Sequence, residues 1–337
     1  MCTPLGIAAH YGRLDVVQEM LRTHPEMLHA DGDYALRASV TYNYLDVAVA
    51  LMEAGADVHA CNSEALRRAA EGGHAPMVAA LLAHGADKNA MGGNPLRKAA
   101  AAGHKEVVAA LLEAGADPHH RDDYALRKAA AAGHTAVVAA LGRAGADVDA
   151  RDNQALRRAC YEVRMEVVQL LLQSGADVHV HEDVCLRTAA AAGHVALVQL
   201  LLGFGADVRA WDEEALCAAV KYDHVDVVRV LLAAGADARS KCNAALCYAV
   251  EKGRPEMVSL LLEAGANPCA RENLPLHVAV KHCNEELVSL LLRYRPRSVG
   301  PDEALEHALR SAHRHAGGGG GGSAAAVLLL LGEYAAK

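Results

Sequence analysis

Hydrophobic residues return along this chain at intervals of 30 residues. A leucine keeps one phase in nine successive segments, and the two terminal leucines each fall one residue early. These leucines are Leu5, Leu36, Leu66, Leu96, Leu126, Leu156, Leu186, Leu216, Leu246, Leu276 and Leu305. The tripeptide Gly-Ala-Asp recurs with the same spacing from Asp57 to Asp237. A fixed period of this size indicates a solenoid, and we predict ten full repeats and a partial eleventh.

Each repeat contains two short apolar patterns with helical spacing. In segment 95–117, Leu96, Ala99 and Ala100 share one helical face, and the valines and leucines of 107–112 share another. Gly103 and Gly115 follow these patterns, and we expect both in the left-handed conformation that ends a helix. The sequence therefore predicts two helices in every repeat.

Polar residues three positions before the recurring leucine are of types that begin helices. They are Asp33, Ser63, Asp123, Asn153, Asp183, Asn243 and Asn273. Such N-cap residues contribute about 1 kcal/mol each. We expect them to cap the first helix of their repeats.

Composition limits the core and the compartment. Apolar residues make up 53% of the 337 residues but aromatics only 4%, so Ala, Val and Leu must form the core. A formal charge of −8 gives no general attraction to nucleic acid or anionic membranes. The longest apolar run, 324–331, is shorter than the roughly 20 residues of a spanning helix, and the first residues lack the pattern of a secretory signal. Nine cysteines, an odd number without close pairs, indicate free thiols. We expect a soluble protein that is cytoplasmic or nuclear and is not secreted.

The repeat resembles the ankyrin repeat. Thr3, Pro4 and Leu5 match the opening of the family's T-P-L-H-x-A-A pattern, and segments 103–108 and 115–117 match its G-H, V-V and G-A-D parts. The match recurs in register over almost the whole chain. The resemblance implies an all-α ankyrin-type helical solenoid of about ten to eleven helix-turn-helix repeats. It also implies a non-catalytic protein–protein interaction module, an adaptor or scaffold that binds through a concave face and projecting fingers.

Two features depart from the family pattern. The repeats have 30 residues and not the usual 33, and the deficit falls in the finger, so we expect tight turns in place of long hairpins. Arginine also replaces the family's histidine, at Arg37, Arg67, Arg97, Arg127, Arg157 and Arg187, and Cys217, Cys247 and His277 follow at the same position.

The C-terminal part departs from the regular period. We divide the chain into an ankyrin repeat array over 1–316, a flexible glycine-rich insertion over 317–323 and a capping helix over 324–337. An eleventh first helix is expected over 306–312. The apolar residues 327–331 would pack on the tenth repeat.

The stacked arginines offer an alternative function. Arg67, Arg97, Arg127 and Arg157 could form a ladder for nucleic acid, phosphoinositides or another acidic ligand. Carboxylates precede each first helix, however, and we expect them to pair with these guanidinium groups. Layers about 8 to 10 Å apart also match duplex phosphates poorly, so a structural role is favoured and nucleic acid is not an expected partner.

Histidine and cysteine patterns do not predict a metal site or a cofactor. His74, His104, His134, His194 and His224 recur in successive layers, too far apart to share one zinc ion. The resemblance implies that they tie loops to neighbouring repeats. No catalytic triad, phosphate loop or paired-carboxylate motif is present, and we predict that the chain is not an enzyme.

Residues that vary between repeats are candidates for partner binding. Aromatic residues at the end of the first helix and in the fingers supply large contact area with a polar tip. The candidates are Tyr42, Tyr124, Tyr161, Trp211, Tyr222 and Tyr248. We expect a monomer that binds an unidentified protein partner.

Overall fold

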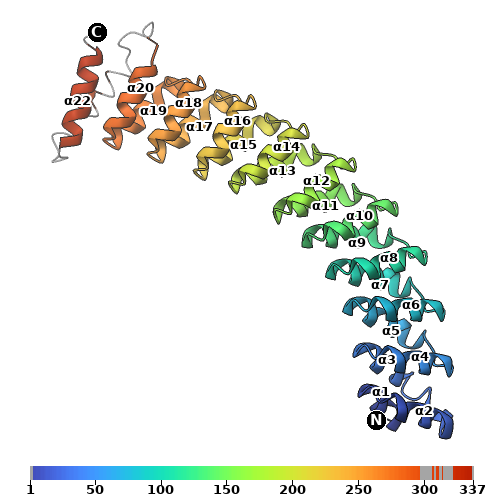
Figure 1. Cartoon of the computed structure of the whole chain (residues 1–337). Coiled ribbons are helices and arrows are strands. Elements are labelled where there is room, and N and C mark those ends of the chain that lie inside the picture. Colours follow the sequence, from blue (N-terminus) through green and yellow to red (C-terminus); the bar gives the residue numbers. More distant parts are fainter. Residues whose placement is uncertain (1–2, 297–305, 307–308, 311–312, 314–321, 336–337) are drawn as a thin grey trace. The chain divides into compact units, whose positions relative to one another are not determined.

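The computed structural model describes residues 3–296, 306, 309–310, 313 and 322–335 (Figure 1). Within these ranges the chain is helical and has no strand, and ten repeats each supply a first and a second helix. The first helices are α1 (Pro4–His10), α3 (Tyr34–Thr41), α5 (Ala60–Gly72), α7 (Ala90–Ala102), α9 (His120–Ala132), α11 (Ala150–Tyr161), α13 (Val180–Ala191), α15 (Ala210–Lys221), α17 (Ser240–Glu251) and α19 (Ala270–Lys281). The all-α solenoid of two-helix repeats is confirmed.

The second helices are shorter and follow after a tight turn. They are α2 (Leu14–Thr23), α4 (Leu45–Glu53), α6 (Ala75–Ala83), α8 (Lys105–Glu113), α10 (Thr135–Arg143), α12 (Met165–Gln173), α14 (Val195–Gly203), α16 (Val225–Ala233), α18 (Pro255–Glu263) and α20 (Glu285–Tyr294). A short 3-10 helix, η1 (Pro25–Met27), follows α2. Gly103 ends α7 with φ 82° and Gly115 follows α8 with φ 81°, as predicted.

The recurring leucine lies at the centre of each repeat's core. From Leu5 to Leu276, all ten described members of the series are between 0% and 2% exposed. In the second helix of the fourth repeat, Val107, Val108 and Leu111 are fully buried. Truncating one such leucine to Ala costs about 2–5 kcal/mol. The hydrophobic period therefore marks the core in both helices.

The predicted N-caps are wrong, because the seven polar residues have left-handed backbone and not the extended backbone of a cap. Asp33 has φ 53° and makes no capping hydrogen bond. Its Oδ1 instead accepts from the Asp57 amide at 3.0 Å, which joins the start of a repeat to its end. Asp123, Asp183, Glu213 and Asn243 make the equivalent bond. In the repeats of Gly93 and Asn153, the acceptor is the residue four positions earlier. There, Asn89 Oδ1 accepts from the Asp117 amide, and Asp149 Oδ1 accepts from the Asp177 amide.

The recurring histidine joins successive repeats. The His134 ring nitrogen Nε2 lies 3.2 Å from the carbonyl oxygen of Ala101 in the preceding repeat. The ring lies so close to Gly103 that an added Cβ there would be 2.6 Å away. His104 and His224 make the same carbonyl contact. The role implied by the family resemblance is confirmed for these three residues.

The chain divides into two compact units, residues 1–177 (unit 1) and 178–337 (unit 2). In unit 2, α22 (Gly322–Ala335) packs against α20, and Val327 and Leu331 are buried (Figure 1). Most of the predicted eleventh first helix, 306–312, and of the glycine-rich insertion, 317–323, lies outside the described residues. The capping role of 324–337 stays a prediction.

Candidate functional site

Each finger, the turn at the N-terminal end of a first helix, contains left-handed residues, and in most repeats this turn falls within the helix bounds given above. Arg151, Asp152 and Asn153 have φ values of 54°, 55° and 54°. Residues 31–33, 61–63, 91–93, 121–123, 181–183, 211–213 and 271–273 repeat this turn. The left-handed conformation costs a non-glycine residue roughly 1–2 kcal/mol. A turn with this cost needs support from outside its own backbone.

The stacked arginines supply this support. Arg157 donates from Nε to the Asp152 carbonyl oxygen at 2.9 Å and from Nη2 to the Arg151 carbonyl oxygen at 3.2 Å. We call this pair of bonds the arginine clamp. The same two bonds are made by Arg37, Arg67, Arg97, Arg127 and Arg187. A planar guanidinium suits this task because its donors form a rigid fork.

The carboxylate partners that we predicted for these arginines are wrong at most positions. Arg37 does pair with Glu64, at 2.5 Å between Nη1 and Oε2. For the candidate ladder of Arg67, Arg97, Arg127 and Arg157, the described partners of Nε and Nη2 are finger carbonyls. These four side chains are half-buried. Their first role is to hold the short finger.

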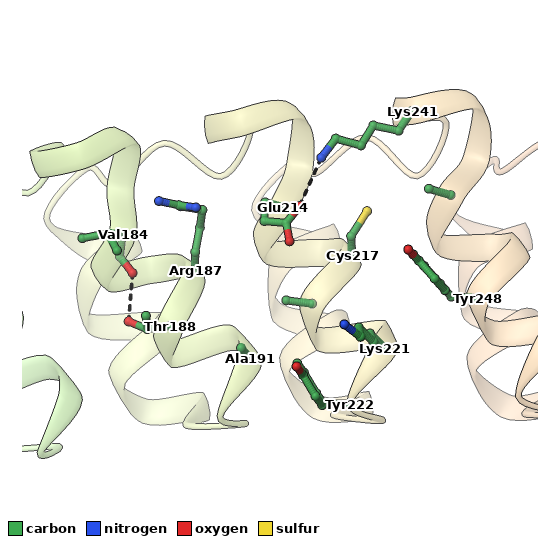
Figure 2. A pocket seen from close by; sticks show the side chains of 12 residues that line it. Val184, Arg187, Thr188, Ala191, Glu214, Cys217, Lys221, Tyr222, Lys241 and Tyr248 are labelled. Carbon is green, nitrogen blue, oxygen red and sulfur yellow. Dashed lines mark hydrogen bonds and ion pairs between the residues drawn. The ribbon is translucent and has the colours of Figure 1, made fainter.

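The clamps end in unit 2, where Cys217 and Cys247 take the arginine position in the two repeats after Arg187. An open cleft of about 320 Å³ borders Cys217 (Figure 2). Eleven of the twelve lining residues come from α13, α15 and α17, and the twelfth, Tyr222, directly follows α15. The cleft therefore belongs to the first-helix face, the surface formed by the first helices of a unit. Cys217 and Ala218 border this space with short side chains, whereas the sixth repeat has Arg157 and Arg158 at these positions.

The cleft is walled by two tyrosines and a thiol. Figure 2 shows Tyr222, which directly follows α15, and Tyr248 from α17 around it together with Cys217. Tyr222 and Tyr248 are 54% and 40% exposed, whereas Cys217 is buried. Burial raises the pKa of the Cys217 thiol, so this group is neutral at physiological pH. It is a small apolar wall and not a reactive thiolate.

Charged groups line the cleft's margins. The Lys241 ammonium lies 3.1 Å from Glu214 Oε2 (Figure 2), and this hydrogen bond raises the pKa of Lys241. The Lys221 ammonium lies 5.3 Å from the centre of the Tyr222 ring, within the range of a cation–π contact. Lys221 forms no ion pair within the described part of the chain. It is the cation with capacity for a ligand.

A second cleft of about 160 Å³ adjoins the first and shares Ala244 and Tyr248 with it. It lies between α17 and α19 and is lined by Cys247, Glu251, Arg271, Leu274, Pro275 and Val278. Both clefts therefore occur where arginine is replaced by cysteine.

Trp211 lies in the finger beside the first cleft. The guanidinium carbon of Arg187 is 4.1 Å from the centre of its ring, although 60% of the side chain is exposed. Arg187 lines the cleft, so Trp211 belongs to the same region as Tyr222 and Tyr248. The structure brings these three predicted residues together.

The other three predicted residues lie in unit 1, apart from one another. The Tyr42 ring lies edge-on to His10 with centroids 4.4 Å apart. Tyr124 is contacted by the cationic groups of Arg97, Arg127 and Lys128 at 5.4 to 5.5 Å. Tyr161, at the end of α11, is 71% exposed.

The sequence reasoning missed Cys217 and Cys247 as cleft-forming residues. Their signal was present, because they interrupt the series of arginines, but only their thiol chemistry was weighed. Leu274 was also missed, since a single leucine carries no distinctive pattern.

The described residues contain neither a metal cluster nor a membrane-spanning helix. No group of three or more His, Cys, Asp or Glu side chains is placed to hold a metal ion there. Within the same part of the chain, no helix combines the length and apolar character needed to span a bilayer.

Comparisons with known proteins agree with the repeat architecture. The family described as "Ankyrin repeats (3 copies)" matches residues 54–122 and 186–272, and the family "Ankyrin repeat" matches residues 124–153 and 271–299. The crystal structure of the human ASB11 ankyrin repeat domain is similar, with a TM-score of 0.50 and 25% sequence identity. This match covers 69% of the present chain and 97% of that domain. A search of curated protein sequences found no match.

Proposed function

Because this chain belongs to the ankyrin repeat family, whose repeats are generally protein-interaction modules, we propose that it is a non-catalytic adaptor or scaffold. Its partner protein would bind the first-helix face and the fingers. The proposal includes a monomeric chain that works in the cytoplasm or nucleus without a cofactor.

Exposed aromatic side chains on a rigid array carry this proposal. The recurring leucines are buried, yet the large side chains at Tyr161, Trp211 and Tyr222 are more than half exposed. Exposed tyrosine and tryptophan are the residues that most often dominate binding energy when a partner covers them. Tyr42, Tyr124 and Tyr248 complete the proposed set.

The alternative of an acidic ligand on Arg67, Arg97, Arg127 and Arg157 has less support. Two finger carbonyls already accept from Nε and Nη2 in each case, and Nη1 of Arg127 also donates to Gln154, so at most one terminal nitrogen remains for a phosphate. Bidentate recognition of phosphate needs two donors of the fork. A function that depended on the ladder would also show affinity that falls steeply with salt.

Affinity capture from cell lysate tests the proposed function. The baits are the unchanged chain, a variant with Tyr161, Trp211 and Tyr222 changed to Ala, and Phe204→Ala as a control. Phe204 is an exposed aromatic residue that follows the second helix α14, away from the first helices.

We expect proteins that the unchanged chain and Phe204→Ala both retain at raised salt and that the triple variant loses. Equal capture by all three baits would refute a role for the first-helix face. Loss of acidic material from every bait at raised salt would favour the arginine ladder instead.

A further inference from the structure

We propose that the two adjoining clefts of unit 2 form one docking site for a protein segment that carries large apolar side chains flanked by acidic residues. This inference rests on the proposed protein-binding function and adds the location and the chemistry of the partner. We call the combined surface the cysteine cleft, defined by Cys217, Tyr222, Lys221, Tyr248 and Leu274.

The character of the first-helix face changes along the chain. Two residues after the recurring leucine, four successive repeats of unit 1 have basic side chains, whereas unit 2 has smaller or uncharged ones. The basic residues are Arg68, Lys98, Lys128 and Arg158, and the unit 2 residues are Thr188, Ala218, Tyr248 and Val278. This change comes one repeat before the arginine clamps end, because Arg187, next to Thr188, still makes the clamp. Two columns of cations are thus replaced by a hollow surface with apolar walls.

The hollow suits apolar side chains of a partner. Tyr222 and Tyr248 expose ring surface, Leu274 is exposed at the second cleft, and the Cys217 thiol is neutral. Covering such surface removes apolar area from water, which favours association. Because Tyr248 separates the two clefts, a segment that fills both needs two large apolar side chains.

The charge of the lining selects an acidic segment. Arg187, Lys221, Lys241 and Arg271 oppose Glu214 and Glu251, so four cations and two anions leave a local charge of +2. The whole chain, in contrast, has a formal charge of −8. A local positive field within an acidic protein steers an acidic partner to this surface.

A protein segment fits better than a nucleic acid. The two carboxylates in the lining would repel a phosphate backbone, and Lys241 is already bound to Glu214. The apolar walls would remain uncovered by phosphate and sugar. A peptide can satisfy Lys221 with one carboxylate and cover both tyrosines with its own side chains.

The chain itself provides the variant that closes the site. Cys217→Arg with Cys247→Arg restores the residue that six earlier repeats have at this position. Each new guanidinium is expected to clamp its own finger and to fill the space of the cleft. The variant should therefore keep its fold, which circular dichroism and urea unfolding check, and lose the docking site.

The experiment selects random short peptides from a display library on the unchanged full chain. Enriched peptides are then synthesised with a fluorophore, and binding is measured by polarisation. We expect enriched sequences to combine acidic residues with two large apolar ones. Their binding should weaken by at least about tenfold on the double arginine variant, on Tyr248→Ala and when the peptide's acidic residues become Lys. Tyr161→Ala, on the first-helix face of unit 1, should bind unchanged.

Several results would overturn the proposal. They are enrichment of basic or wholly polar sequences, equal binding to the double arginine variant, and a selection that enriches nothing. Peptides that Tyr161→Ala loses and the double arginine variant retains would place binding elsewhere. In that case the protein-binding function would stand and the cysteine cleft would fail.

Discussion

The arginine clamp can be tested by copying the natural exception into a repeat that has the clamp. Arg157→Cys places in the sixth repeat the cysteine that the eighth and ninth repeats have at this position. It removes the bonds of 2.9 Å and 3.2 Å to the finger carbonyls of Asp152 and Arg151. Hydrogen bonds from charged groups contribute about 1.5–3 kcal/mol each when shielded from water. Since this site is half-exposed and water replaces part of each bond, we expect a total loss of about 2 kcal/mol.

Two measurements apply to this substitution. Urea unfolding followed by far-UV circular dichroism should show a lower midpoint. Hydrogen exchange of the peptide that contains 151–153 should show faster local opening, because the left-handed turn has lost its support. The local measurement matters because a repeat array need not unfold in one step.

Arg158→Cys is the matched control. It removes the same charge one residue further along α11, where the side chain is exposed and makes no clamp. We expect a change below about 0.5 kcal/mol, as for other surface substitutions. Equal effects at Arg157 and Arg158 would refute the clamp and leave only a general effect of net charge. The reverse change, Cys217→Arg, should raise stability.

Four further predictions follow from single observations. Burial raises the pKa of the Glu213 carboxyl, so the folded chain gains stability as pH falls through that raised pKa. Glu213→Gln should therefore raise the urea midpoint of unfolding at pH about 7.5, and it should raise this midpoint by a smaller amount near pH 5. Asp152→Gly should stabilise by about 1 kcal/mol or less in urea unfolding, because its φ is 55° and the left-handed conformation costs a non-glycine residue more than glycine's extra entropy in the unfolded chain. Gly103→Ala should cost about 1 kcal/mol more than Gly85→Ala by the same assay, since both have positive φ but only Gly103 lies against a histidine ring. Removing 324–337 should increase binding of a hydrophobic dye by exposing α20, and unchanged dye binding would refute the capping role.

The hydrophobic period was enough to predict the fold. Leucines at 30-residue intervals, with glycine at the end of each helix, leave few alternatives to stacked two-helix repeats. Gly103 and Leu96 show why. Gly103 has a left-handed backbone and Leu96 is buried, and in each case the residue type alone predicts this.

The fingers could not be predicted in the same way. Asp33 and its equivalents are good N-cap residues by type, and the sequence does not show that their backbone is left-handed. Their side chains were expected to serve the helix that follows, but Asp33 serves the amide of Asp57. The arginine clamp was missed for a related reason, because its acceptors are backbone carbonyls and carry no sequence signal.

The candidate site was predicted in part. Tyr222, Tyr248 and Trp211 were chosen as aromatic residues at variable positions, and they lie in one region. Tyr42, Tyr124 and Tyr161 were chosen by the same rule and lie apart from one another. Tyr42 lines only a small cleft of about 90 Å³ beside Arg37 and Arg68, whereas Tyr222 and Tyr248 line the larger cleft beside Cys217. The size of a cleft depends on the neighbouring side chains as much as on the aromatic residue itself.

The two replacements by cysteine therefore connect stability with function. At Arg157 the guanidinium holds a strained finger and fills the first-helix face at the same time, so the two effects cannot be separated in that repeat. At Cys217 neither the clamp nor the filling of the face is present. The finger of Trp211 has three left-handed residues without an arginine clamp, and the space beside Cys217 is open. Proteins commonly accept a local loss of stability where function needs an open or strained site. The loss of the clamp is only partly offset, because Ser240 Oγ donates to the Asp212 carbonyl and Arg271 Nη2 donates to the Lys241 carbonyl, one bond in each finger in place of two. A docked partner segment would add support by covering the cleft and ordering the finger beside it.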